Sequence, residues 1–445
     1  MSFQTASNLE IIMKPAFQTS AAKLALAGIL FYTGYGLANF LASRRAFVPE
    51  IVFDWERGIP FWAWTIVPYW SLNLMYAAAF FLCRTTREQN RYLAQLAAAQ
   101  IAAVGCFLLF PLRFSWPKPP SDGLFGVLFA SLASFDQPYN QAPSLHIALT
   151  LIVGAFYWHR FPKIRLPLAC WQSLIALSVL ATYQHHFIDI PTGALLGTLV
   201  LWAWPYRGQS PFRRPDAAGR LRDRRIRERQ LGGLYLIGAA AAALPALSGG
   251  AWLWTLWISA ALLLCAFAYF SGNPAALQKQ PSGKFSPAAA WLLLPYLIGV
   301  RLNMAFWLRG RARSTEISDG IHIGSLLDAP HFPAVLDLCA EYPARHRAAY
   351  LTLPLSDLVT PSESELVQAA ETVESLRRQH GRVLVCCALG YGRSAAAALT
   401  WLTAYGGRTP EQAAALLQAA RPQALIRPDA VQAAAAAAGR LKKAV

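Results

Sequence analysis

Long apolar runs separated by short polar segments dominate the first 270 residues of the chain. A helix needs about 20 mostly apolar residues to cross a bilayer. Runs of about this length lie at residues 22–43, 60–83, 92–112, 142–159, 166–184, 187–205, 231–248 and 251–271. A further stretch, 288–308, is interrupted by Arg301 and Asn303, so we expect it to lie along the membrane interface, with a ninth span as the alternative. The pattern predicts an α-helical transmembrane bundle of about eight spans.

From Ser314 onward, short apolar strands alternate with helical segments. Strands are expected at residues 321–323, 335–338, 350–353 and 383–386. Ser362 and Glu365 form a capping box before a predicted helix over 363–380, which Gly381 ends. This alternation predicts a soluble α/β domain of about 130 residues, large enough for its own core. We therefore divide the chain into a membrane module (1–206), a basic linker with additional helices (207–313) and an α/β domain (314–445).

Composition and charge support a membrane protein. Hydrophobic residues make up 55% of the chain and charged residues only 14%, whereas soluble domains carry about 25% charge. The net charge is +17, and nine arginines lie between Arg207 and Arg229. Beside apolar spans, such a cluster favours the cytoplasmic membrane surface and anionic lipid over nucleic acid, so no nucleic-acid partner is expected. The first run has no cleavage site of a signal peptide, and the seven cysteines show neither disulfide nor zinc spacing.

Basic residues alternate between the predicted loops and indicate sidedness. Lys14 and Lys23, the segments 84–91 and 160–165, and the Arg207–Arg229 cluster would face the cytoplasm. Eight spans then return the chain to the cytoplasm before the α/β domain, in a multi-pass protein of the inner membrane. A ninth span over 288–308 would instead place that domain outside.

One loop of the α/β domain has the form of a phosphate trap. An apolar strand runs into Cys387, and Arg393 and Ser394 open an alanine-rich helix six and seven positions later. Backbone amides and the positive helix end favour a bound anion, and Arg393 supplies a planar fork for two phosphate oxygens. The same field favours a thiolate at Cys387. The predicted phosphate-binding positions are Ala388, Leu389, Gly390, Tyr391 and Gly392.

This Cys-x5-Arg-Ser pattern resembles the signature of the cysteine-based protein tyrosine and dual-specificity phosphatases, over residues 314–445. The resemblance implies that Asp357, about 30 residues before the cysteine, is the general acid, and that Ser394 hydrogen-bonds the thiol as it leaves. The family usually has histidine just before the cysteine, where this chain has Cys386. The loop interior holds no Lys or Arg, which weighs against highly phosphorylated inositol headgroups.

A second set of polar residues lies in the membrane half. His146 begins one predicted span and His185 ends the next, so both reach the same face, and Asp189 follows His185 by one helical turn. Arg113 and Lys118 are expected on that face as phosphate-binding cations. Two imidazoles, a carboxylate and cations suit phosphoryl transfer, with one imidazole attacking phosphorus and the other protonating the leaving oxygen.

Residues 20–206 resemble the type 2 phosphatidic acid phosphatase superfamily. The motif Pro-Ser-x-His is matched at 143–146, which adds Ser144 to the phosphate site, and a second motif is matched except that Val179 replaces its arginine. The resemblance implies a phosphohistidine at His185, oriented by Asp189, with His146 as general acid. The whole chain resembles bacterial fusions of such a membrane module with a dual-specificity phosphatase module.

These features together predict an integral membrane phosphatase that hydrolyses phosphomonoesters, with a phosphorylated lipid as its substrate class. Neither mechanism needs a metal or another cofactor. Two alternatives remain open. The membrane module could transfer a headgroup between lipids, as a lipid phosphotransferase does, or it could be degenerate and only tether a protein tyrosine or dual-specificity phosphatase.

Overall fold

The computed structural model describes residues 13–208, 210–212, 222–346 and 349–444. The chain divides into two compact units, residues 1–206 and 207–445, which we describe separately. Arg213, Arg214 and Arg220 of the basic cluster lie outside the described residues.

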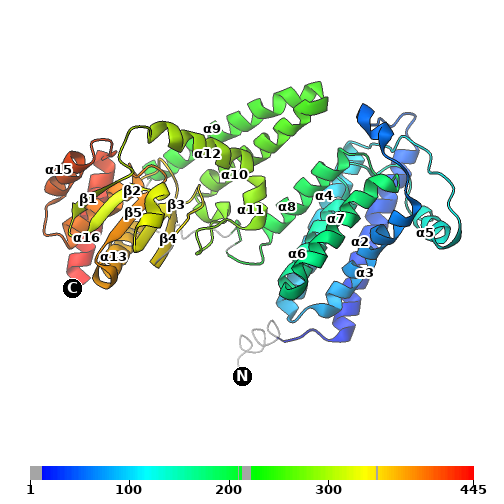
Figure 1. Ribbon diagram of the computed structural model, residues 1–445, viewed down its shortest axis with the longest axis horizontal. Helices are drawn as coiled ribbons and strands as arrows, with labels where there is room; N and C mark the ends of the chain where they lie inside the picture. The colour runs from blue at the N-terminus through cyan, green and yellow to red at the C-terminus, as the bar shows by residue number, and fades with distance from the viewer. Residues whose placement is uncertain (1–12, 209, 213–221, 347–348, 445) are drawn as a thin grey trace. The chain divides into compact units, whose positions relative to one another are not determined.

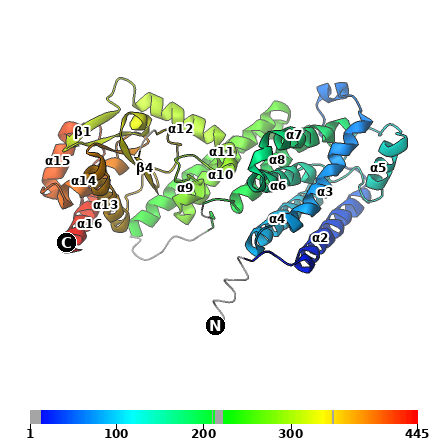
Figure 2. The same ribbon diagram turned by 60° about the horizontal axis from the view of Figure 1, so that its bottom comes forward.

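The described part of the first unit consists of helices and their connecting loops (Figure 2). Its α-helices are α2 (Phe17–Ser43), α3 (Ile66–Leu82), α4 (Thr86–Leu109), α5 (Gly123–Ala133), α6 (Leu145–Arg160), α7 (Arg165–Ala181) and α8 (Asp189–Ala203). Short 3-10 helices, η1 (Asp54–Gly58), η2 (Ala63–Thr65) and η3 (Pro162–Ile164), lie in the connections. The core of this bundle is formed by apolar side chains of α2, α3, α4 and α6, including Leu72, Phe80, Leu96 and Ile152.

Each of the eight predicted spans contains a helix, but not all of these helices are equally long. Among the described residues, six helices are long and apolar enough to cross a membrane, namely those at 17–43, 63–82, 86–109, 162–181, 223–248 and 250–271. α6 and α8 have only 16 and 15 residues, which is short of the ~20 residues that a span needs. α5 was not predicted, because its apolar segment falls in an expected loop. The count of eight spans stays a prediction.

Two glycines allow α6 and α8 to pack closely. A Cβ atom on Gly193 would lie 2.4 Å from the carbonyl oxygen of Ser144, and one on Gly197 would lie 3.0 Å from that of Ala148. Small residues spaced by one helical turn let helix backbones approach in this way. The approach brings the start of α6 next to the start of α8, where Asp189 lies.

The second unit begins with helices that precede the sheet. α9 (Arg222–Ala243) and α10 (Thr255–Ser271) form a hairpin through the 3-10 helices η4 (Leu244–Ser248) and η5 (Gly250–Trp254). The short η6 (Pro274–Leu277) follows. The segment expected at the interface folds as two helices, α11 (Pro287–Leu292) and α12 (Leu294–Trp307), which are not among the span candidates.

The α/β part contains a five-stranded mixed sheet in the order β1-β2-β5-β3-β4 (Figure 1). The strands are β1 (Ser314–Ser318), β2 (Ile321–Ser325), β3 (Ala334–Cys339), β4 (Ala349–Leu355) and β5 (Val383–Cys387). β5 pairs in parallel with both β2 and β3, while β1 is antiparallel to β2. The four predicted strands form, and β1 was not predicted because its sequence, STEIS, has little apolar character.

Helices cover both faces of this sheet. α13 (Glu363–His380), α14 (Arg393–Ala404), α15 (Pro410–Ala420) and α16 (Pro428–Ala444) pack through Leu366, Val373, Leu399 and their neighbours against one face. α13 has the predicted bounds, the Ser362–Glu365 capping box and Gly381 at its end. On the other face, α12 contributes Met304 and Leu308 to a core with η7 (Leu326–His331), β3 and β5. The helices before Ser314 are therefore built into this unit.

Candidate active site

The loop between β5 and α14 is shaped around one glycine. Gly390 has φ of 75°, a conformation that residues with a side chain rarely adopt. A Cβ atom there would also lie 2.3 Å from the carbonyl carbon of Gly324 in β2. Glycine is thus required both for the backbone turn and for the close contact with the neighbouring strand. The turn directs the loop over the carboxyl end of β5, where Cys387 lies.

Cys387 is buried at the bottom of this loop. Its Sγ accepts the backbone N–H of Gly390 at 3.3 Å and lies 3.6 Å from the hydroxyl of Ser394. Both donors stabilise negative charge on sulfur. The contact between Ser394 and sulfur is the geometry in which a hydroxyl can stabilise a leaving thiolate. Ala388, Leu389, Tyr391 and Gly392 line the cavity above the sulfur.

Arg393 is held at the site by carboxylates. Its Nη1 donates to Glu341 at 2.7 Å, its Nη2 pairs with Glu341 and lies 2.9 Å from Asp357, and Nη1 also reaches the carbonyl of Leu355. Arg393 Nε is buried and has no hydrogen-bond partner among the described residues. A buried donor without a partner is costly, and a phosphate oxygen would satisfy it.

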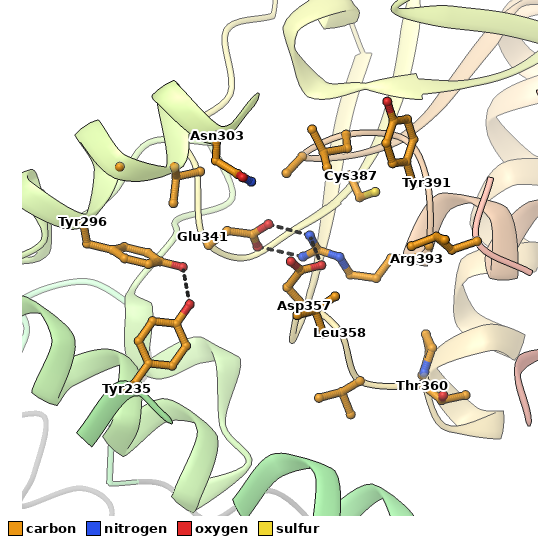
Figure 3. A pocket seen from close by; sticks show the side chains of 18 of the residues that line it. Tyr235, Tyr296, Asn303, Glu341, Asp357, Leu358, Thr360, Cys387, Tyr391 and Arg393 are labelled. Carbon is orange, nitrogen blue, oxygen red and sulfur yellow. Dashed lines mark hydrogen bonds and ion pairs between the residues drawn. The ribbon is translucent and has the colours of Figure 1, made fainter. Parts of the chain in front are cut away.

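Asp357 faces the same guanidinium from the loop after β4 (Figure 3). Burial and the neighbouring Glu341 carboxylate raise the pKa of Asp357 from its ordinary value, and Arg393 opposes this increase. The side chain keeps 47% of its surface exposed, so solvent moderates the increase. A raised pKa suits a general acid, because the proton is retained to higher pH. Glu341, in contrast, has a lowered pKa, since its bonds to Arg393 outweigh its burial.

Two charged residues of the site were missed from the sequence. Glu341 follows β3, and Arg421 directly follows α15 and is completely buried. Arg421 donates to the carbonyls of Gly390 and Leu389 at 2.9 and 3.1 Å and so holds the backbone of the Cys387 loop. No spacing rule links either residue to Cys387, because each is brought there only by the packing of the sheet and helices.

Cys386 occupies the position that the resemblance gives to histidine, and it points away from the site. Its side chain lies in the core shared with α12, next to the carbonyl oxygen of Leu336. Burial in this apolar core raises the pKa of the Cys386 thiol well above its usual value, which disfavours a reactive thiolate. Cys386 is therefore a packing residue.

A cavity of about 460 Å³ lies over the Cys387 loop and has two unlike walls. One wall consists of the loop with Glu341, Asp357 and Arg393. The opposite wall consists of residues from α9, α10 and α12, among them Tyr235, Ile258, Leu262, Tyr296, Val300 and Asn303. Figure 3 shows Tyr235 and Tyr296 on the side of the cavity away from Arg393 and Asp357. The two tyrosine hydroxyls lie 3.5 Å from each other. The site therefore faces a largely apolar surface supplied by the helices before the sheet.

The first unit gathers several predicted residues at a second cavity. His185 lies 3.0 Å from Asp189 through Nδ1 and 3.1 Å from the hydroxyl of Ser144 through Nε2. His146 stacks on Tyr69 with ring centroids 3.8 Å apart, and both histidines line a cavity of about 250 Å³. The structure thus brings the two predicted histidines to one cavity and sets Asp189 beside His185. Ser144 contacts His185 directly, and it also caps α6 through the N–H of Ile147.

The predicted cations are not brought into this cavity. Arg113 is exposed and pairs with Glu50 at 3.5 Å, and Lys118 does not line the cavity, although its charge interacts with that of Asp136 in the lining. The described lining includes Asp136, which bonds Tyr35 at 2.7 Å, but no Lys or Arg. Val179, where the resembled motif has arginine, is fully buried among apolar side chains. Asp136 was missed because it lies 49 residues before His185 and matches no motif.

His186 belongs to a separate set of contacts. It lies 3.3 Å from Glu56 and 2.9 Å from the hydroxyl of Ser115, and its ring stacks on Phe114. These bonds fasten the 113–118 loop and η1 to the start of α8, so His186 is a structural neighbour of His185. In the described part of the chain, no three His, Cys, Asp or Glu side chains gather closely enough to hold a metal ion.

Comparison with protein families matches residues 320–432 to the dual specificity phosphatase catalytic domain. Solved structures similar to the chain include PTPMT1 in complex with PI(5)P (14% identity, 30% of this chain and 99% of that chain, TM-score 0.27), the active form of Tk-PTP (20%, 30% and 98%, 0.26) and human DUSP28 (19%, 30% and 95%, 0.25). A search of curated proteins finds no match.

The chain therefore carries a cysteine-based phosphatase domain of the dual-specificity type, and the protein is a phosphatase. The matched residues contain β2 to β5, the Cys387 loop, Glu341, Asp357 and Arg393. The family match does not extend to the helices of the first unit, nor to α9 through α12.

Proposed function

We propose that this protein is an integral membrane phosphatase whose Cys387 site hydrolyses the phosphomonoester of a membrane lipid. The observation that carries this proposal is the cavity with two walls. Ile258 and Leu262 line it from α10, a helix long and apolar enough to cross a bilayer, and Cys387 and Arg393 line it from the other side. A phosphate bound by the loop would thus have its organic part against apolar surface, as an amphipathic substrate requires.

The charges of the cavity favour a substrate with a single phosphate group. Arg393 and Arg427 are the cationic residues in its described lining, and Arg427 is already paired with Asp429 at 3.4 Å. Each additional phosphate would need further cations to compensate its charge. We therefore expect a lipid phosphomonoester with a small or uncharged remainder rather than a multiply phosphorylated headgroup.

The chemistry follows from the contacts of the site. The Cys387 thiolate attacks phosphorus, and the bond from phosphorus to the leaving oxygen breaks while Asp357 gives its proton to that oxygen. Water then attacks the phosphocysteine, and the Asp357 carboxylate takes a proton from it. The sulfur–phosphorus bond breaks, and the Ser394 hydroxyl and Gly390 N–H stabilise the thiolate that leaves. Arg393 and the loop amides bind the transferring oxygens.

The experiment measures phosphate release from a diacylglycerol phosphate in mixed micelles by the purified full-length protein. Cys387→Ser should abolish release, and Cys386→Ala is the matched control because that thiol lies in the core. Leu262→Gln, which changes only the apolar wall, should lower kcat/KM for the lipid and leave a water-soluble aryl phosphate unaffected. Equal kcat/KM changes for both substrates would contradict a lipid-binding wall.

For the first unit we propose a weaker phosphohistidine-type activity at His185 on the same class of lipid. Its support is the alignment of Ser144, His185 and Asp189 and the presence of His146 in the same cavity. The first unit has two alternative roles, headgroup transfer to an alcohol and simple tethering. One test separates them from hydrolysis. Lipid turnover by the Cys387→Ser protein, followed with and without an added alcohol, separates hydrolysis, transfer and no chemistry.

We further propose that the protein resides in the bacterial inner membrane with its phosphatase domain at the cytoplasmic face. The basic residues at the start of α9 support this orientation. Fusions of alkaline phosphatase and of a fluorescent reporter after Lys443 test it. Active alkaline phosphatase there would mean that the domain lies outside.

A further inference from the structure

The loop that carries the general acid contains a residue in an unfavourable backbone conformation. Leu358, directly after Asp357, has φ of 57°. Large L-residues rarely adopt this left-handed region, and where they do, the surrounding structure holds them there. What holds Leu358 therefore also fixes the backbone from which the Asp357 side chain projects.

Two side chains of the α9–α10 hairpin donate hydrogen bonds to the carbonyl groups of Asp357 and Leu358. The hydroxyl of Tyr269, near the end of α10, donates to the carbonyl oxygen of Asp357 at 3.1 Å. Arg227, in the second turn of α9, donates through Nε to the carbonyl oxygen of Leu358 at 3.4 Å. Both peptide groups that determine the orientation of residue 358 are thus bonded to helices outside the α/β fold.

Side-chain packing reinforces these bonds. Val359 is buried in a small cluster with Leu231 of α9 and Tyr269 of α10. Tyr269 is itself held by Tyr235, whose ring stacks on it with centroids 5.4 Å apart. At the start of α9, Arg224 forms two hydrogen bonds with Glu365, the capping residue of α13, at 2.6 and 3.2 Å. The hairpin is therefore attached both to the acid loop and to the start of α13 that follows it.

We propose that the α9–α10 hairpin positions the general acid of the phosphatase, with Tyr269 as the main positioning residue and Arg227 as its support. The bond from Tyr269 holds the Asp357 carbonyl, and this directs the Asp357 carboxyl toward Arg393 and the cavity. Because α9 and α10 are also candidate spans, the proposal makes acid catalysis depend on helices that belong to the membrane region. It rests on the phosphatase activity of the Cys387 site and not on the lipid nature of the substrate.

The test uses Tyr269→Phe in the full-length protein with two water-soluble substrates. An alkyl phosphate has a basic leaving group that needs the proton of Asp357, whereas p-nitrophenyl phosphate has a leaving group that departs with little help. We expect kcat/KM to fall about 10-fold for the alkyl phosphate and less than about 2-fold for p-nitrophenyl phosphate, as partial loss of general-acid catalysis requires. In the Asp357→Asn background, Tyr269→Phe should have no further effect on either substrate.

Two further variants keep the result interpretable. Arg227→Gln changes an exposed side chain, so folding should be unaffected. This variant should also lower kcat/KM selectively for the alkyl phosphate, by less than Tyr269→Phe does. Tyr405→Phe is the matched control, because Tyr405 follows α14 and does not line the cavity. An equal loss on both substrates in Tyr269→Phe and Arg227→Gln, or no loss on the alkyl phosphate, would overturn the proposal. Soluble substrates also separate this outcome from a failure of the lipid proposal.

Discussion

Each of the two candidate sites has a nucleophilic side chain beside partners that orient or stabilise it. The sites differ in the groups that could compensate the charge of a bound phosphate. At Cys387, loop amides, a helix start and the buried Arg393 converge on one position. At His185, Asp189 and Ser144 orient the imidazole, yet the described cavity lining offers an acidic residue, Asp136, and no Lys or Arg. A well-oriented nucleophile is thus not sufficient for phosphate chemistry, because the site must also compensate the charge of the substrate.

The largest expected effect is the loss of the nucleophile. Cys387→Ser should lower hydrolysis of a small aryl phosphate by at least ~10³-fold, because a neutral hydroxyl replaces the thiolate. His185→Ala should leave this soluble activity unchanged. Release of phosphate measured on the two purified variants checks both statements, and an active Cys387→Ser protein would overturn the assignment of the site.

Arg393→Lys should lower kcat/KM by about 10²-fold or more, as is found when one preorganised donor to transition-state charge is removed. Lysine keeps the charge but cannot bond Glu341 and a phosphate through a planar fork. Steady-state kinetics on an aryl phosphate measure the loss. Wild-type kcat/KM in the Arg393→Lys variant would mean that charge alone, without the fork, is enough at this site.

Asp357→Asn should lower the rate by about 10²-fold on alkyl phosphates and should change the pH profile. The acid works while it is protonated, so wild-type activity should fall as the pH rises through the pKa of Asp357. Because that pKa is raised, the fall should begin at a higher pH than for an ordinary aspartate. The variant should lack this decline, and a decline that persists in Asp357→Asn would assign the acid to another group.

The smallest activity is expected at the second site. In the Cys387→Ser background, lipid phosphate turnover should be at least ~10²-fold below wild type, because no Lys or Arg lines the described part of the His185 cavity. The remaining turnover should vanish in the additional His185→Ala variant. Residual turnover that survives without His185 would show that this imidazole is not the nucleophile, and a complete absence of turnover would favour the tether.

The sequence predicted those parts of the α/β domain that are set by local order. The capping box and Gly381 determined the bounds of α13, and the spacing of Cys387, Arg393 and Ser394 predicted the strand, loop and helix around the phosphate position. These features depend on residues that lie within a few positions of one another along the chain, so they can be recognised in the sequence.

Residues brought in over long distances were not predicted. Glu341, Arg421 and Tyr269 reach the Cys387 loop or its acid only through the packing of the sheet, α15 and α10. The same limit applies to the first unit, where the predicted cation Arg113 turns out to pair with Glu50. Tertiary packing decides which charges meet, and periodicity carries no information about it.

The most direct measurement identifies the residue that takes the phosphoryl group from a lipid. The full-length protein is incubated with a ³²P-labelled diacylglycerol phosphate in mixed micelles and quenched, and the labelled peptide is located. We predict a label on Cys387 that is absent in Cys387→Ser and retained in His185→Ala. A label on His185 as the main phosphoenzyme, unaffected by Cys387→Ser, would contradict this assignment.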